Sequence, residues 1–429
     1  MATKFEAGHV LTMDDSLTVY SPGAVVFEGQ TLVYVGPPDR YRESVAQEVV
    51  IPEGVLMPGL INGHSHAAMS LMRGLADDSP FFEWLTQHVW PVEARLTADD
   101  IRLGVLLAAA EMIHSGTVGF ADMYFEVDAA CESVDKSGMR AWISRGLDKP
   151  SEEKLAQSLE FCRTWRGRAD GRIQTMLGPH APYTCPPEFL QEIAESAVAH
   201  ALGIHIHLSE SAEEMRQMQE RYQKTPIQLA YDAGIFKART LIAHGVYIQE
   251  DDLPYLEGLA GGVISCPVSN AKLGNGILPY PLLRGAGVTV GLGTDGAAST
   301  NSLDMFLEMK ALAWMQKMRE GKPEAFRAID ALWAATRGSA AVLGHQGGML
   351  ALGRPADFIV VDGKRAHTTP ELDVVANLVY AASGADVRYV VINGHIVLQE
   401  GIITTFDEKA VLQEAQTRAE HLLEGRDGA

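Results

Sequence analysis

Eight short runs rich in β-branched residues recur through the middle of the chain, each ending in polar residues or glycine, with helical stretches between them. The runs are residues 55–62, 117–122, 140–145, 173–178, 203–208, 241–245, 263–267 and 288–295. Eight strands that alternate with helices are typical of an α/β fold of the (β/α)8 TIM-barrel type. The main alternative, a doubly wound sheet, is disfavoured because no G-x-G-x-x-G follows the first run.

The two ends of the chain have a different pattern from the middle. Residues 24–35 and 388–398 each predict a β-hairpin. The second hairpin contains Asn393-Gly394, a pair whose residues both tolerate the positive φ of a tight turn. Residues 358–361 predict one further strand. Strands at both ends of the chain indicate a small domain to which each end contributes.

We expect that small domain to be a β-sandwich. The spacing of apolar residues after Asp407 predicts a helix that closes it. The predicted division is residues 1–57 for the N-terminal part of the sandwich, residues 58–346 for the barrel, and residues 347–429 for the C-terminal part with the closing helix. A chain of 429 residues is long enough for a barrel and a satellite of this size.

The composition limits the class of partner. With 35 basic and 55 acidic residues, the chain has a formal net charge of −20, which repels phosphate backbones and anionic membranes. We therefore expect a free small molecule as partner and neither nucleic acid nor membrane, with a homo-oligomer left open. Four scattered cysteines, no C-x-x-C and no apolar leader after Met1 favour a reducing, cytoplasmic location.

Residues that bind metals gather at the predicted carboxyl ends of the strands, where barrel enzymes place their chemistry. The first strand ends in His64 and His66, the fifth in His207, the sixth in His244 and the eighth in Asp295. Alternate residues of a strand share one face, so His64 and His66 can reach the same ion. We expect His64, His66 and His207 with the Asp295 carboxylate to hold one divalent metal per chain, Zn²⁺ first and Fe²⁺ as the alternative.

A metal held there would make water a nucleophile, because it lowers the pKa of a bound water toward neutrality. Asp295 can take a proton from that water. Glu210, three residues after His207, can carry a proton to a leaving group or a ring nitrogen. His244 is placed either to orient the hydroxide or to stabilise the developing charge. The expected catalytic residues are therefore Glu210, His244 and Asp295.

Other residues near the strand ends have plainer interpretations. His205 shares a face with His207, and we expect it to be a hydrogen-bonded interior residue. Cys266 ends the seventh strand and is expected to be a small buried hydrophobe. Three further histidines fall on predicted helices or a loop and are assigned to the surface or to packing: His88, His114 and His200.

The motifs at these strand ends resemble those of the amidohydrolase superfamily. They are PGLINGHSH at 58–66, HIHLSE at 205–210, LIAHG at 241–245, GLGTDG at 291–296 and GRPADFIVVD at 353–362. The likeness extends over nearly the whole chain. Bimetallic relatives carry a carboxylated lysine at the end of the fourth strand, where residues 177–180 read LGPH here. The resemblance therefore implies a site with one metal.

A closer resemblance is to the deaminases of 5-methylthioadenosine and S-adenosylhomocysteine. It is carried by residues 66–85, 89–97 and 294–310. It implies a hydrolase that removes the amino group at C6 of an adenine nucleoside and leaves the inosine analogue and ammonia. Glu210 would protonate N1, and both Glu210 and Asp295 would contact the substrate.

The resemblance also assigns substrate contacts. Glu93 would accept hydrogen bonds from the ribose hydroxyls, since a carboxylate offers two acceptor oxygens to a vicinal diol. His180 would contact the nucleoside, and Arg145 would lie near the substrate tail. An apolar wall would come from Met69, Met72, Phe81, Trp84 and Met123. Some relatives carry a second arginine soon after the first, where this chain has only Lys149 and Lys154. A lysine cannot reproduce a guanidinium fork, so methylthioadenosine and adenosine are favoured over S-adenosylhomocysteine.

Two other functions remain open at this stage. One keeps the chemistry but changes the ring, to deamination or dechlorination of a free guanine, oxidised guanine, cytosine or s-triazine. Glu93 would then have no ribose to bind. The other is a metal-binding barrel without catalytic activity, retained as an assembly or regulatory subunit. Such a protein would have no use for Glu210 and His244.

Overall fold

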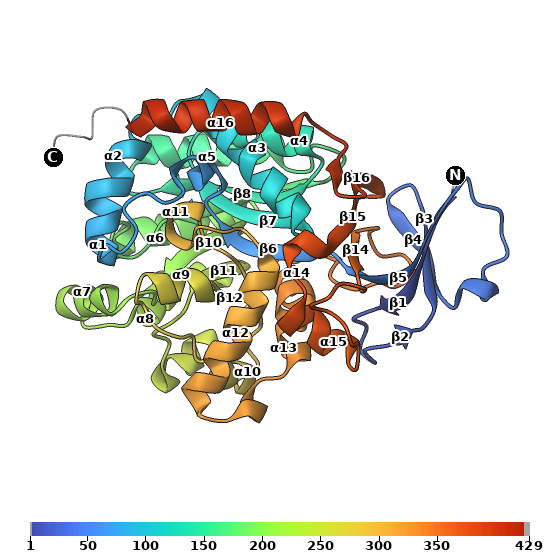
Figure 1. Cartoon of the computed structure of the whole chain (residues 1–429). Coiled ribbons are helices and arrows are strands. Elements are labelled where there is room, and N and C mark those ends of the chain that lie inside the picture. Colours follow the sequence, from blue (N-terminus) through green and yellow to red (C-terminus); the bar gives the residue numbers. More distant parts are fainter. Residues whose placement is uncertain (1, 424–429) are drawn as a thin grey trace.

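The structure is a computed structural model that describes residues 2–423. A parallel eight-stranded sheet forms a barrel, and a nine-stranded sheet lies beside it (Figure 1). The barrel strands pair in chain order: β6 (Leu60–Ser65), β7 (Thr117–Tyr124), β8 (Arg140–Leu147), β9 (Ile173–Pro179), β10 (Gly203–Leu208), β11 (Thr240–His244), β12 (Gly261–Ser265) and β13 (Val290–Leu292). The prediction of a (β/α)8 barrel with a second domain from both chain ends is confirmed.

The end of β13 is held against β6. The backbone amides of Thr294 and Asp295 both donate to the carbonyl oxygen of His64, at 3.2 and 3.0 Å. Gly293 permits this close approach, because a Cβ at that position would lie 2.7 Å from the backbone nitrogen of His64. Barrel closure therefore places Asp295 beside His64 at the carboxyl end of the strands.

Helices surround the barrel (Figure 1). The longer ones are α3 (Ala98–His114), α4 (Val127–Ser137), α5 (Glu152–Trp165), α6 (Pro187–Ala199), α7 (Ala212–Tyr222) and α12 (Met305–Glu320). Thr97 caps α3 in a reciprocal pair with Asp100, in which each side chain accepts from the other's backbone amide. The closing helix α16 (Glu408–Leu423) packs along α3, where Arg418 pairs with Asp100. Within residues 2–423, no helix combines the length and apolarity that crossing a membrane requires.

Both chain ends contribute strands to the second sheet. Its order is β17-β16-β15-β14-β5-β1-β3-β4, with β2 paired to β1. The strands are β1 (Ala2–Leu11), β2 (Val19–Tyr20), β3 (Gly23–Glu28), β4 (Thr31–Gly36), β5 (Gln47–Pro58), β14 (Phe358–Asp362), β15 (Val387–Ile392), β16 (His395–Gln399) and β17 (Ile402–Ile403). Both predicted hairpins are present, as β3–β4 and β15–β16, and Asn393 and Gly394 both have positive φ.

This sheet curls around a core of its own. The rings of Phe27 in β3 and Phe358 in β14 have centroids 5.9 Å apart, although two other strands separate β3 from β14. In a flat sheet, that strand separation would be roughly 14 Å. Phe5 in β1 packs against both rings, at 6.4 and 5.1 Å. The predicted sandwich is therefore built from one continuous curved sheet.

The first predicted run, residues 55–62, spans two strands. Its residues up to Pro58 belong to β5 of the curved sheet, and β6 of the barrel begins at Leu60. Between them, the amide of Gly59 donates to the carbonyl oxygen of Asp357, so the chain crosses between the sheets beside the returning segment. The run looks unbroken in the sequence because both strand ends are buried. The crossing supports the domain boundaries that we propose: 1–57, 58–346 and 347–429.

A buried ion pair ties the curved sheet to the barrel. The Asp357 carboxylate, next to β14, accepts from Arg140 Nε at 2.7 Å and Nη2 at 3.0 Å at the start of β8. It also accepts from the backbone amide of Asn393 at 2.7 Å, and His345 Nε2 lies 3.3 Å away. Burial alone would raise the pKa of Asp357, but Arg140 and His345 lower it to about 2.

Candidate active site

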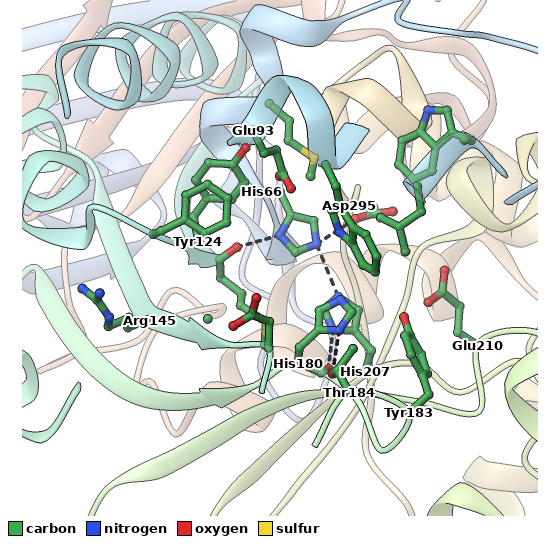
Figure 2. Close-up of a pocket in the computed structure, with 18 of the residues that line it drawn as sticks. His66, Glu93, Tyr124, Arg145, His180, Tyr183, Thr184, His207, Glu210 and Asp295 are labelled. Atoms are coloured by element: carbon green, nitrogen blue, oxygen red, sulfur yellow. Dashed lines mark hydrogen bonds and ion pairs between the residues drawn. The ribbon is translucent and has the colours of Figure 1, made fainter. Parts of the chain in front are cut away.

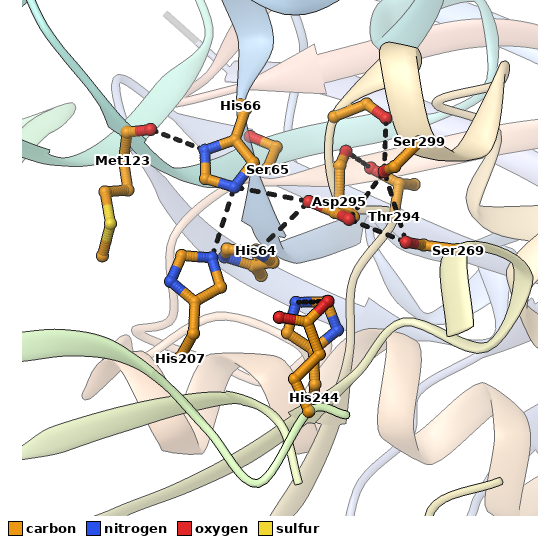
Figure 3. A network of polar contacts seen from close by, with 12 residues as sticks. His64, Ser65, His66, Met123, His207, His244, Ser269, Thr294, Asp295 and Ser299 are labelled. Atoms are coloured by element: carbon orange, nitrogen blue, oxygen red, sulfur yellow. Dashed lines mark hydrogen bonds and ion pairs between the residues drawn. The ribbon is translucent and has the colours of Figure 1, made fainter. Parts of the chain in front are cut away.

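The four residues that the sequence predicts as metal ligands converge at the carboxyl end of the barrel (Figure 3). His64 and His66 come from the end of β6, His207 lies in β10, and Asp295 follows β13. Asp295 Oδ1 lies 3.5 Å from His64 Nε2 and 3.4 Å from His66 Nε2. His207 Nε2 lies 3.3 Å from His66 Nε2. Residues far apart in the sequence thus present one nitrogen or oxygen each to a common point.

Two of the imidazoles are oriented by backbone carbonyls. His66 Nδ1 lies 2.7 Å from the carbonyl oxygen of Met123 in β7, and His207 Nδ1 lies 2.8 Å from the carbonyl oxygen of His180. A carbonyl oxygen can only accept, so each Nδ1 carries a proton, and in the neutral tautomer the lone pair of Nε2 points into the site. This is the usual way in which proteins fix metal-binding histidines.

The third imidazole, His64, is oriented by another histidine. His64 Nδ1 lies 2.7 Å from His205 Nε2, and His205 Nδ1 lies 3.2 Å from the hydroxyl of Ser144. That hydroxyl donates to the carbonyl oxygen of Asp122. His205 is a buried, hydrogen-bonded residue, and its partner is one of the candidate ligands. The contact directs His64 Nε2 toward Asp295.

The arrangement fits a divalent cation. Within residues 2–423, His64 Nε2 is buried without a hydrogen-bond partner. The Nε2 atoms of His66 and His207 face each other with their lone pairs, a repulsive contact unless a cation lies between them. Burial lowers the pKa of His64 to about 3, which keeps the ring neutral and able to coordinate. The candidate ligand atoms of His64, His66 and His207 lie within 4.8 Å of one another, as do those of His64, His244 and Asp295.

The two oxygens of Asp295 have different surroundings. Oδ2 accepts hydrogen bonds from the hydroxyls of Ser269 at 2.7 Å and Ser299 at 2.6 Å, and Oδ1 faces the imidazoles (Figure 3). Burial would raise the pKa of Asp295, but the neighbouring histidines hold it well below its usual range. The φ of both Asp295 and His244 is 70°, in the left-handed region, and such backbone strain clusters at functional sites.

Glu210 and His244 face each other beside this cluster. Glu210 follows β10 and His244 ends β11, and Glu210 Oε1 lies 3.8 Å from His244 Nε2. His244 Nδ1 lies 2.9 Å from Asn270 Oδ1, and Asn275 Nδ2 donates to Glu210 Oε1 at 3.2 Å. Burial and then the charge of Asp295 raise the pKa of Glu210 to about 8. A carboxyl with this pKa holds a proton at neutral pH, as a general acid must.

A cavity of about 630 Å³ opens over these groups (Figure 2). The candidate ligands and expected catalytic residues that line it are His66, His207, Glu210, His244 and Asp295. Its walls carry Glu93 from α2 (Trp90–Glu93), Arg145 from β8 and His180 after β9. Of the five apolar residues expected there, four line the cavity: Met69, Phe81, Trp84 and Met123. Met72 is buried in the surrounding core instead.

The walls of the cavity differ in charge. Burial raises the pKa of Glu93, whose carboxyl lies beside the Tyr124 hydroxyl. Burial lowers the pKa of His180 to about 4, so that ring is neutral. Lys154 pairs with Asp148 at 2.8 Å, both on the cavity wall. Arg145, by contrast, forms no ion pair with a carboxylate among residues 2–423. Of the described residues that line the cavity, it is the only arginine.

Several residues of the site were not predicted from the sequence. Tyr124 and Tyr183 line the cavity, but aromatic residues near strand ends are common in any core. Asn270 is hydrogen-bonded to His244, and Asn275 is hydrogen-bonded to Glu210. Both asparagines follow the seventh barrel strand, where the sequence predicts a role only for Cys266, as a small buried hydrophobe. The polar run after Cys266, at the carboxyl end of a barrel strand, is the signal that points to them.

Comparisons with known proteins identify a family and several related chains. The amidohydrolase family model matches residues 55–397. A 5-methylthioadenosine/S-adenosylhomocysteine deaminase of Pelotomaculum thermopropionicum is 43% identical over 422 residues, 96% of this chain and 97% of that protein. A 5'-deoxyadenosine deaminase of Methanosarcina acetivorans is 43% identical over 420 residues, 97% of each chain. The solved structure of an adenosine deaminase from Xanthomonas campestris with bound zinc has 32% identity and a TM-score of 0.94, with 98% of each chain covered.

Proposed function

The chain belongs to the amidohydrolase family, and on that premise we propose that it hydrolytically deaminates the adenine ring of a nucleoside. Water adds at C6, ammonia leaves, and the inosine analogue remains. One observation carries the proposal: three of the four candidate metal ligands, His66, His207 and Asp295, line one cavity together with Glu210 and His244, and the wall of that cavity also carries Glu93. The relatives named as deaminases of 5-methylthioadenosine/S-adenosylhomocysteine and of 5'-deoxyadenosine support it.

We assign one divalent metal per chain to His64, His66, His207 and Asp295, with Zn²⁺ favoured, as in the adenosine deaminase, and Fe²⁺ as the alternative. When bound, such a metal lowers the pKa of a coordinated water toward neutrality. The protein's own contribution is orientation. Contacts on the far nitrogen of each imidazole aim the three Nε2 atoms, and two serine hydroxyls on Oδ2 of Asp295 leave Oδ1 for the site.

Two side chains transfer protons, and a third orients the attacking water. Asp295 Oδ1 takes one proton from the attacking water. Glu210, protonated at neutral pH, gives its proton to N1 of the ring and so makes C6 more electrophilic. His244 directs its Nδ1 proton to Asn270, so its Nε2 accepts a hydrogen bond from the water and orients it. Asp295 then returns its proton to the leaving amino group, and Glu210 recovers one from the hydroxyl at C6.

The cavity walls provide the nucleoside contacts. The Glu93 carboxyl, at the end of α2, offers two oxygens to the ribose diol. The neutral ring of His180, which follows β9, contacts the nucleoside from another part of the cavity wall. Apolar side chains around the cavity suit the adenine ring and a thioether. At about 630 Å³, the cavity is in the size range of small-molecule sites.

We further propose that nucleosides with a neutral 5′ group are the better substrates: 5'-methylthioadenosine, 5'-deoxyadenosine and adenosine. Lys154 is already paired with Asp148, which leaves Arg145 alone to meet the carboxylate of S-adenosylhomocysteine. A single guanidinium without a second fork gives that carboxylate one bidentate partner at most. S-adenosylhomocysteine is therefore the expected weaker substrate.

The test is release of ammonia by the purified, metal-loaded protein from a panel of amino-heterocycles. The panel contains 5'-methylthioadenosine, 5'-deoxyadenosine, adenosine, S-adenosylhomocysteine, free adenine, guanine and cytosine. The proposal predicts the highest kcat/KM for the first three nucleosides. A higher kcat/KM for a free base would favour the free-ring alternative, and bound metal without ammonia from any compound would favour a barrel without catalytic activity.

A further inference from the structure

One short segment after β12 contacts Asp295, His244 and Glu210, the three side chains to which we assign the chemistry, although these come from three different strand ends. The segment, residues 266–275, reads CPVSNAKLGN and includes the helix α9 (Pro267–Lys272). Its three hydrogen bonds run from Ser269 Oγ to Asp295 Oδ2 at 2.7 Å, from His244 Nδ1 to Asn270 Oδ1 at 2.9 Å, and from Asn275 Nδ2 to Glu210 Oε1 at 3.2 Å. Figure 3 shows the contact of Ser269 with Asp295.

The three residues of the segment that make these contacts are buried and fixed. The exposed fractions of Ser269, Asn270 and Asn275 are 0%, 1% and 5%. The amide of Asn275 donates to the carbonyl oxygen of Asn270 at 2.8 Å, which ties the two asparagines together. From outside, the buried carboxylate of Glu308 accepts from the amide of Val268 at 3.1 Å. Because these contacts fix the segment, its hydrogen bonds also fix the positions of the side chains that it contacts.

We propose that Ser269, Asn270 and Asn275 are positioning residues. Each holds one side chain in place: Ser269 holds Asp295 and Asn275 holds Glu210 for their proton transfers, and Asn270 holds His244 where it orients the attacking water. This inference rests on the proposed function. None of the three touches the reacting atoms; each acts through the group to which it is hydrogen-bonded. A single rigid segment that holds all three groups keeps their mutual distances fixed, which three independent loops would not do.

The two asparagines have opposite roles in their hydrogen bonds, one as acceptor and the other as donor. Asn270 presents its carbonyl oxygen to His244 Nδ1, so it is needed as an acceptor. Asn275 presents its amide nitrogen to Glu210 Oε1, so it is needed as a donor, and its contact leaves Oε2 to carry the proton. Aspartate has the size of asparagine but is only an acceptor when ionised. Exchange to aspartate should therefore be tolerated at position 270 and harmful at position 275.

The test compares Asn270→Ala, Asn270→Asp, Asn275→Ala and Asn275→Asp, each metal-loaded, with 5'-methylthioadenosine as substrate. Removal of a residue that orients an active-site group typically costs about 10- to 100-fold in activity. We expect a fall of that size in kcat for both alanine variants, with KM nearly unchanged. Asn270→Asp should exceed Asn270→Ala in kcat, and Asn275→Asp should fall below Asn275→Ala, because a second carboxylate then faces Glu210. A purely structural role predicts that aspartate is the milder change at both positions, and that outcome overturns the inference.

Two further measurements keep the inference separate from the fold and from the proposed function. Ala271→Ser, an exposed neighbour on the same helix, is the matched control and should leave kcat and Tm unchanged. If Asn270→Ala does not fold, Asn270→Leu fills the same volume without an acceptor. In wild-type protein labelled with ¹⁵N-histidine, the Nδ1–H of His244 should give a protected NMR signal that Asn270→Ala loses and Asn270→Asp keeps.

The NMR signal does not depend on turnover. If that signal behaves as expected but wild-type protein releases no ammonia, the proposed function fails while the contact between His244 and Asn270 stands. If ammonia is released but the order of the aspartate and alanine variants is the same at both positions, the positioning inference fails and the proposed function stands.

Discussion

Exchange of Glu210 for glutamine isolates proton transfer from binding, and the chain contains a matched control for it. Glu210 and Glu214 are both buried, and burial raises the pKa of each to about 8. Only Glu210 lines the cavity among these two. Glu214 instead accepts a hydrogen bond from the amide of Glu210, at 2.8 Å. The two carboxyls therefore share an environment but differ in access to the substrate.

The expected magnitude follows from what glutamine keeps. At position 210 it preserves the volume and an oxygen that accepts from Asn275, but it has no acidic proton to donate. General acid catalysis contributes about 10²- to 10⁴-fold, or about 3 to 5 kcal/mol of transition-state stabilisation. We expect Glu210→Gln to lower kcat by this factor while KM and metal content stay close to wild type. Glu214→Gln keeps an acceptor for the Glu210 amide and should retain most of the wild-type kcat.

The assay is release of ammonia from 5'-methylthioadenosine under saturating substrate, with metal per chain measured on the same samples. Glu210→Gln protein that holds its metal and turns over at the wild-type rate would refute the proton-transfer role. Equal losses in Glu210→Gln and Glu214→Gln would also refute it, because they would show that loss of any buried carboxyl in this region is harmful regardless of its access to the cavity.

Other predictions concern the metal, the ribose and the joint between domains. His64→Ala should lose metal and turnover together. A chelator should abolish turnover reversibly while the far-ultraviolet circular dichroism stays unchanged. In both experiments elemental analysis measures the metal per chain, and release of ammonia measures the turnover. Glu93→Ala should lower kcat/KM for nucleosides by about 10- to 100-fold, since hydrogen bonds to a charged group are worth roughly 1.5 to 3 kcal/mol, and leave any activity on free adenine unchanged. Arg140→Met should lower the free energy of unfolding by about 3 to 5 kcal/mol by leaving the buried Asp357 unpaired, as measured in denaturant. The pKa of Asp357 falls from 3.8 to about 2 on folding. The ionised carboxylate therefore contributes about 2 kcal/mol to the free energy of unfolding above pH 4, and this contribution is lost as the pH falls toward 2. Asp357→Asn should lack this part of the acid dependence.

The parts of the fold and site that sequence reasoning predicts are those governed by short-range periodicity. Strand residues alternate between two faces, so His64 and His66 had to point the same way once a strand was expected there. Barrel geometry then brings the carboxyl ends of all strands together, which accounts for His207 and Asp295. Strand boundaries are harder to predict, because residues 55–61 contain no polar side chain although they belong to two sheets.

The contacts that orient the ligands are harder to predict, because they depend on loop paths that have no period. His205 was correctly expected to be buried, but only the closed barrel, which brings β6 and β10 together in space, shows that its partner is His64. Asn270 and Asn275 lie five residues apart, a spacing without meaning in a strand or in one face of a helix. They reach His244 and Glu210 because the chain turns after α9.

The orienting contacts also bear on how the metal site is formed. His64, His66 and His207 are each held on Nδ1, and Asp295 is held on Oδ2, by groups that are not candidate ligands. To turn away from the site, Asp295 would have to break two hydrogen bonds, each worth about 1.5 to 3 kcal/mol for a charged acceptor. Hydrogen bonds within the protein therefore hold all four candidate ligands in place, and two imidazole nitrogens lie 3.3 Å apart. A cation between those nitrogens would relieve the repulsion of their lone pairs, so we expect the site to favour a positive charge.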